Sequence, residues 1–124
     1  MSNERIEFDF EKLEVYQLAL GLLDQFFIIH RGLSHDLKFS LGDQLIRAGL
    51  SISNNIAEGS GKVSPKEKAR YYTTALDSTR ECVSIVTVLR RQALINQACY
   101  ELLRVHCWRI SSMLFRLRSA VKGR

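Results

Sequence analysis

The stretch that decides the fold is residues 51–81, which read SISNNIAEGSGKVSPKEKARYYTTALDSTRE. Apolar residues at helical spacing lead to Gly59, which we expect to end a helix because glycine adopts the left-handed conformation at little steric cost. A second helix is predicted to begin with Ser64 as its N-cap, Pro65 in its first turn and Glu67 reaching back to the Ser64 amide. Because so short a turn places two helices side by side, the stretch predicts an antiparallel helical hairpin.

Outside this hairpin, the apolar periodicity predicts two further helices and no competing strands. The expected fold is therefore all-α, an antiparallel up-down four-helix bundle in a single domain over residues 1–124, with helices at about 10–31, 41–58, 65–92 and 97–121. We expect Asp9, Ser40 and Asn96 to cap the first, second and fourth helices. The expected core seams are Leu13, Tyr16, Leu20, Leu23 and Phe27; Leu41, Leu45, Ala48, Ile52 and Ile56; Tyr72, Leu76, Thr79, Val83 and Val86; and Cys99, Leu103, His106, Ile110, Met113 and Leu117.

Two of these helices carry more apolar surface than one bundle core requires. On the fourth, Trp108 and Phe115 fall roughly opposite the seam, in a stripe that also contains arginines. On the first, additional apolar residues lie beside the seam. Exposed Trp, Phe and Arg are typical of protein interfaces, so we predict a homo-oligomer, with base stacking on nucleic acid as the alternative. The residues predicted for the oligomer interface are Trp108, Phe115, Val15, Leu22 and Phe26.

The net charge of +5 is concentrated at the C-terminal end. Residues 1–89 contain ten Lys/Arg and twelve Asp/Glu, whereas residues 90–124 contain eight Lys/Arg and one acidic residue, Glu101. This gradient favours an anionic partner, although a solvated basic face needs none. The alternatives are RNA or DNA and an acidic protein. The residues predicted to contact nucleic-acid phosphates are Arg104, Arg116, Arg118, Lys122 and Arg124.

Residues 53–59, SNNIAEG, and the polar series that follows resemble the bacterial four helix bundle protein family, which includes proteins encoded by intervening sequences in large-subunit ribosomal RNA genes. The family in turn resembles the accessory protein of diversity-generating retroelements. That resemblance implies a ring-like homopentamer that binds nucleic acid and a protein partner. The polar residues that match the family are Asn55, Glu58, Ser64, Glu67, Arg70, Ser78 and Glu81. We interpret them first as contacts between helices or subunits, with a ligand site or a solvated face as alternatives.

The sequence does not contain the residue spacings of common helical enzymes. There is no Glu-x-x-His pair for a di-iron centre. Arg31 and His35 are separated by three residues, fewer than in small helical ribonucleases, and the GSGK at 59–62 lacks the strand and spacing of a phosphate loop. We therefore expect no enzyme activity, no catalytic residue and no cofactor, with a hydrolase that uses His35 or His106 as the competing hypothesis.

Cysteine spacing and hydropathy exclude further classes. Cys82, Cys99 and Cys107 show neither zinc-ligand spacing nor an even number, so we expect buried free thiols and no metal. The longest apolar stretch, residues 18–29, is interrupted by polar residues, and the first twelve residues do not resemble a secretory signal. We expect a cytoplasmic protein that does not enter the membrane.

Overall fold

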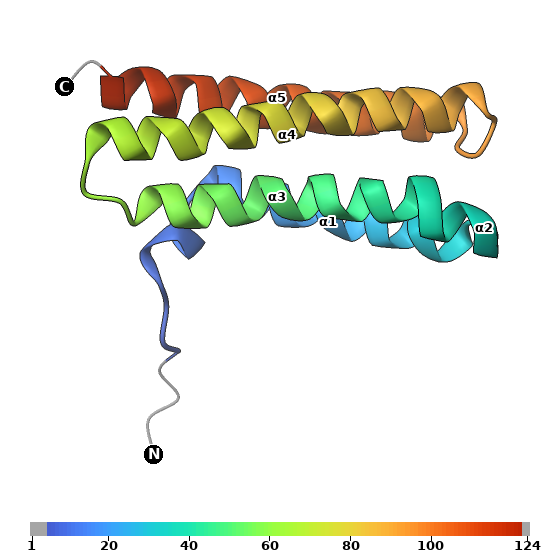
Figure 1. Ribbon diagram of the computed structural model, residues 1–124, viewed down its shortest axis with the longest axis horizontal. Helices are drawn as coiled ribbons and strands as arrows, with labels where there is room; N and C mark the ends of the chain where they lie inside the picture. The colour runs from blue at the N-terminus through green and yellow to red at the C-terminus, as the bar shows by residue number, and fades with distance from the viewer. Residues whose placement is uncertain (1–4, 123–124) are drawn as a thin grey trace.

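The computed structural model describes residues 5–122 of the 124-residue chain. Within this range, four long helices form the bundle: α1 (Glu14–Gly32), α3 (Asp43–Ser60), α4 (Pro65–Arg91) and α5 (Gln97–Lys122). Helices α4 and α5 form one layer and α1 and α3 the other, and α3 packs on both α1 and α4 (Figure 1). The described residues contain no strand. The all-α four-helix fold is therefore confirmed.

The chain enters α1 differently from the prediction. Asp9 does not cap a helix that begins at residue 10. It begins a short 3-10 helix, η1 (Asp9–Lys12), which packs on both α1 and α3. Leu13 then has an extended backbone, with φ −70° and ψ 125°, and interrupts the helical path. Helix α1 starts only at Glu14, without a side-chain cap.

The start of the second predicted helix also differs. Ser40 lies inside a short π-helix, η2 (Lys38–Gly42), between α2 (His35–Leu37) and α3. Its hydroxyl donates to the carbonyl of Asp36 at 3.0 Å, so Ser40 does not cap α3. The path stays helical through Gly42, where a Cβ atom would lie 2.9 Å from the His30 ring. The close packing of Gly42, the last residue of η2, against α1 therefore determines where α3 starts.

The predicted caps of α4 and α5 are confirmed. The amide of Glu67 donates to Ser64 Oγ at 3.3 Å, and Pro65 is the first residue of α4. The amide of Cys99 donates to Asn96 Oδ1 at 2.8 Å. The reciprocal half of the Ser64 cap is wrong. The Glu67 carboxylate accepts from Arg70 Nε at 2.9 Å instead of reaching the Ser64 amide.

Gly59 has a different role from the predicted one. It lies inside α3, which continues to Ser60, and no described glycine has a positive φ. A Cβ at Gly59 would lie 2.8 Å from Tyr71 Cβ and 3.1 Å from the Tyr72 ring. The missing side chain therefore allows α3 and α4 to approach closely beside the turn that joins them.

The face of α1 that forms the core is rotated from the predicted seam. Val15, Leu22 and Phe26 are 3%, 0% and 0% exposed, whereas Phe27 is 41% exposed. Of the predicted seam in α1, only Leu23 is buried. The three residues predicted for an oligomer interface therefore belong to the bundle core and are not available to a second copy.

The other three helices follow their predicted seams more closely. In α3, the predicted residues Leu45, Ala48, Ile52 and Ile56 are all buried. In α4 and α5, part of each predicted seam is buried, namely Tyr72, Thr79 and Val86 of α4 and Leu103 and Ile110 of α5, and the core extends to neighbouring positions. The buried residues outside the predicted seams of these two helices are Ala69, Ala75, Ser78, Cys82, Ile85, Leu89, Cys107, Leu114 and Val121. Within residues 5–122, no helix combines the length and apolar character needed to cross a bilayer.

Candidate subunit and nucleic-acid interface on helices α4 and α5

The outer face of α5 exposes large apolar side chains that the bundle does not use. Trp108, the only tryptophan of the chain, is 74% exposed, and Phe115 is 56% exposed. Val105 and Leu102 on the same helix are 54% and 52% exposed. Exposed apolar residues gathered on one helix are characteristic of a surface that contacts another molecule. The structure therefore places both aromatic residues of the predicted stripe on the outside.

A groove runs beside these aromatic side chains. One hollow, of about 650 Å³, lies between α4 and α5 on one side of Trp108. A second, of about 400 Å³, lies between Trp108 and Phe115. Because Trp108 and Ser111 line both hollows, we treat them as one feature, the α4–α5 groove. It is lined by Leu76, Arg80, Val83 and Ser84 of α4 and by Arg104, Val105, Cys107, Trp108, Ser111, Ser112, Phe115 and Arg116 of α5.

The groove is basic as well as apolar. Its lining residues include Arg80, Arg104 and Arg116 but no carboxylate. None of these three arginines takes part in the ion pairs found among the described residues. Their charge is therefore available to an anionic group that approaches from outside.

Two further contacts orient arginines along the stripe. The Arg104 guanidinium lies 5.4 Å from the Tyr100 ring centre and donates to its hydroxyl at 3.3 Å. The Arg118 guanidinium lies 5.4 Å from the Phe115 ring centre and donates to Thr73 Oγ1 at 3.3 Å. Stacking of this kind keeps a guanidinium extended along the helix without neutralising it. Of the other predicted phosphate contacts, the side chain of Lys122 and all of Arg124 lie outside the described residues.

The polar residues that match the family do not converge on one site. Asn55 Nδ2 donates to the Ser51 carbonyl at 2.8 Å and lies 3.1 Å from Ser51 Oγ, which is 2.7 Å from Ser78 Oγ on α4. This is a hydrogen-bonded link between two helices. Glu58 and Glu81 are exposed. The remaining family-matched residues, Ser64, Glu67 and Arg70, are grouped in the first turns of α4.

The cysteines are poor candidates for chemistry. Cys82 and Cys107 are buried free thiols, and Cys99 is half-buried. Burial raises the pKa of the Cys107 thiol to about 11 and raises the pKa of Cys82 further. Both thiols therefore stay protonated at neutral pH. Because the thiolate is the reactive form of cysteine, neither side chain is poised to act as a nucleophile. Among the described residues, no group of three or more His, Cys, Asp or Glu side chains is placed to hold a metal ion.

The N-terminal arm, residues 5–8, is a feature outside the predicted helices and predicted site residues. Ile6 and Phe8 are 87% and 63% exposed. Apolar and acidic residues alternate over residues 6–11, IEFDFE, a pattern typical of an extended segment with one apolar edge. This alternation was the available signal, although the extended segment ends at Phe8, because η1 begins at Asp9.

Comparison with known proteins identifies the family. A model of the 23S rRNA-intervening sequence protein family matches residues 11–116. The chain belongs to this family. The match covers the four helices as far as Arg116 and begins after the N-terminal arm. No curated protein matches the chain.

A solved structure shares the fold. It is the crystal structure of a protein of unknown function from the S23 ribosomal protein family of Bacteroides thetaiotaomicron, with a TM-score of 0.78 and 23% sequence identity. The similarity covers 85% of this chain and 95% of that chain. At this identity the comparison supports the fold alone.

Proposed function

We propose that this protein is a non-enzymatic homo-oligomer that binds RNA through the arginines of α5. The observation that carries the proposal is the outer face of α5, where Arg116 and Arg118 lie beside the exposed side chain of Phe115. Arginines without acidic partners bind phosphates and release their counterions. An exposed tryptophan beside them adds apolar contact area for a second copy of the chain.

Assembly into an oligomer is what raises the RNA affinity of the basic helix α5. A single bundle presents only a few arginines, and each phosphate contact is weak on its own. Copies joined around a ring present the same arginines several times, and simultaneous contacts raise the overall affinity without any new interaction. A pentamer is the number implied by resemblance to the retroelement accessory protein.

RNA is preferred to DNA because the chain belongs to the 23S rRNA-intervening sequence protein family. Contacts to phosphates position a nucleic acid without reading its bases, so we expect weak sequence preference. The proposal includes a cytoplasmic location and no cofactor.

The direct test is binding of a labelled single-stranded RNA, measured across a salt series. The affinity should fall steeply with salt. Replacing Arg116 and Arg118 with glutamine should make the negative slope of log K against log salt shallower by about 1.4 per bound protomer. A matched control replaces Arg31 and Arg47, which are exposed on the α1–α3 layer, with glutamine. The control should remove the same charge with a much smaller effect. An oligomer that fails to retain RNA at low salt would refute this function.

The second candidate function is a protein-interaction module with an acidic protein partner. It rests on the same uncompensated arginines together with the apolar surface beside them. It predicts a complex that RNA in excess does not displace, and it becomes the better explanation if RNA binding fails while the arginine variants lose a protein ligand.

A further inference from the structure

We infer that the N-terminal arm of one copy docks in the α4–α5 groove of a second copy. The inference rests on the proposed oligomer and supplies the contact that seats one copy on the next. The arm and the groove are complementary in size, polarity and charge, and both are exposed within one chain.

The arm presents apolar side chains that stay mostly exposed, although the Phe8 ring stacks on Phe10 with 6.0 Å between the ring centres. Ile6 is 87% exposed, and Phe8, with φ −87° and ψ 153°, is extended and 63% exposed. In an extended segment, side chains two residues apart point to the same side. Ile6 and Phe8 therefore form one apolar edge, with Glu7 between them on the other side.

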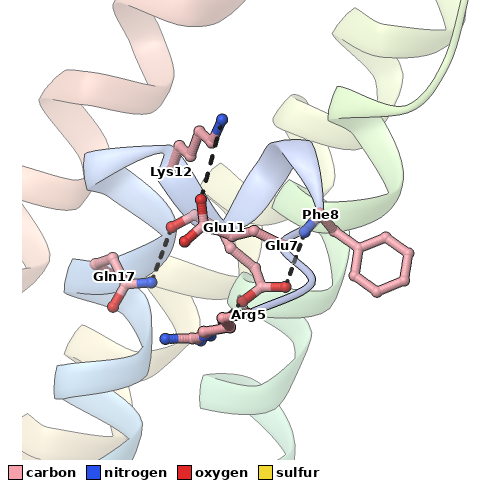
Figure 2. A network of polar contacts seen from close by, with 6 residues as sticks. All are labelled: Arg5, Glu7, Phe8, Glu11, Lys12 and Gln17. Carbon is pink, nitrogen blue, oxygen red and sulfur yellow. Dashed lines mark hydrogen bonds and ion pairs between the residues drawn. The ribbon is translucent and has the colours of Figure 1, made fainter. Parts of the chain in front are cut away.

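The base of the arm is held in place by Glu11. Its carboxylate accepts from the Phe8 amide at 3.1 Å and pairs with Arg5 Nη2 at 3.1 Å. Gln17 Nε2, from α1, donates to the Glu11 carbonyl at 2.9 Å. Figure 2 shows the network around Glu11, with the Phe8 ring turned away from that carboxylate. An arm already fixed in one direction loses less conformational entropy when it binds.

The groove offers the complementary surface. Its larger hollow, of about 650 Å³, falls in the size range of sites that enclose small ligands, enough for an aromatic and an aliphatic side chain. Trp108 and Val105 provide apolar walls, while Arg80 and Arg104 provide positive charge. Residues 5–11 contain three carboxylates and one arginine, so the charges of arm and groove are opposite.

The occupant is a second copy because the arm points away from the groove of its own chain. The arm leaves the bundle beside α3 and runs outward on the side opposite α4 and α5 (Figure 1), and η1 packs on α1 and α3. A contact in which one surface meets a different surface on the next copy is heterologous. Such contacts form a closed ring when the rotation between copies closes.

Cross-linking between two differently tagged copies tests this contact. One copy carries Ile6→Cys and the other Ser84→Cys, in a Cys99→Ser background that removes the accessible native thiol. After mixing and reassembly, a short bis-maleimide should join the two tags. In the matched control, the first copy carries Val63→Cys instead of Ile6→Cys. Val63 is 97% exposed in the α3–α4 turn, and this control should give no product.

Trp108 fluorescence provides a second measurement on the complete chain. Ile6→Ser removes apolar surface without removing any packing inside the bundle, because Ile6 is almost fully exposed. We expect a red shift of the emission and greater quenching by acrylamide as Trp108 becomes more exposed. The control Val63→Ser should change neither.

Native mass spectrometry separates the outcomes. An oligomer that shows neither the cross-link nor a change in Trp108 would overturn the arm contact and leave the proposed assembly intact. A product formed in equal yield by the Val63→Cys control would also overturn it. A monomer under all conditions would refute both proposals. A cross-linked oligomer that does not bind RNA would support the arm contact and refute the proposed RNA function.

Discussion

Replacing Phe26 tests the rotated core of α1 directly. Phe26 is completely buried, and a Cβ added at Gly49 on α3 would lie 2.7 Å from its ring. Phe26→Ala should therefore cost about 3–5 kcal/mol of unfolding free energy, because it removes buried apolar contacts and leaves a cavity. The neighbouring Phe27→Ala should cost far less, since Phe27 is 41% exposed. A loss of 3–5 kcal/mol is a large share of the roughly 5–15 kcal/mol typical of a domain.

Gly49 makes the test sharper. Gly49→Ala alone should be destabilising, because a Cβ only 2.7 Å from the buried Phe26 ring causes overpacking, which costs about 1–3 kcal/mol and outweighs the roughly 1 kcal/mol gain of alanine in a helix. In the Phe26→Ala background the new methyl group enters the cavity, so Gly49→Ala should become stabilising. The coupling between the two positions should be about 1–3 kcal/mol.

The assay is urea unfolding followed by circular dichroism at fixed protein concentration, in the Trp108→Glu background so that assembly does not contribute. The reasoning would be refuted if Phe26→Ala cost no more than Phe27→Ala. It would also fail if the effects of Phe26→Ala and Gly49→Ala were additive.

Three further predictions concern the interface, a helix cap and the thiols. Trp108→Glu should convert the oligomer to monomer while keeping the helical content, and an unchanged mass in native mass spectrometry would contradict the interface. Ser64→Ala should lower the unfolding free energy by about 1 kcal/mol, because the Glu67 amide loses its acceptor; a change of zero in urea unfolding would show that water replaces it fully. Because burial raises the pKa of Cys107 to about 11, the folded state keeps this proton when the unfolded state has lost it. The contribution of Cys107 to the free energy of unfolding should therefore be independent of pH below about pH 8.5 and should decrease as the pH rises towards 11. In thermal melts over this pH range, wild type should lose more stability than Cys107→Ala.

The sequence was sufficient for features that depend on neighbouring residues. The caps at Ser64 and Asn96 were predictable because cap and amide are three residues apart along the chain. The core face of α3 was predictable because its polar residues leave one apolar side. Helix α1 has apolar residues around much of its circumference, so periodicity alone did not decide which side meets α3.

The site was predictable only in part, for the same reason. The exposure of Trp108 and Phe115 follows from their position opposite the α5 seam. The contribution of Arg80 and Ser84 depends on how α4 and α5 are aligned, which is a tertiary property that no local pattern contains. The role of Gly59 was likewise hidden, because its partner is the tyrosine pair on the next helix.

The link between Ser51, Asn55 and Ser78 has a consequence for alignment. Apolar surfaces of two long helices attract one another in many positions, including those displaced by a full turn. Such a displacement would leave the buried Ser78 hydroxyl without its partner, at a cost of about 1–3 kcal/mol. The serine pair contributes little net attraction, but it makes the displaced arrangements less stable. It therefore selects one position of α4 along α3. That position places the tyrosine pair of α4 opposite Gly59.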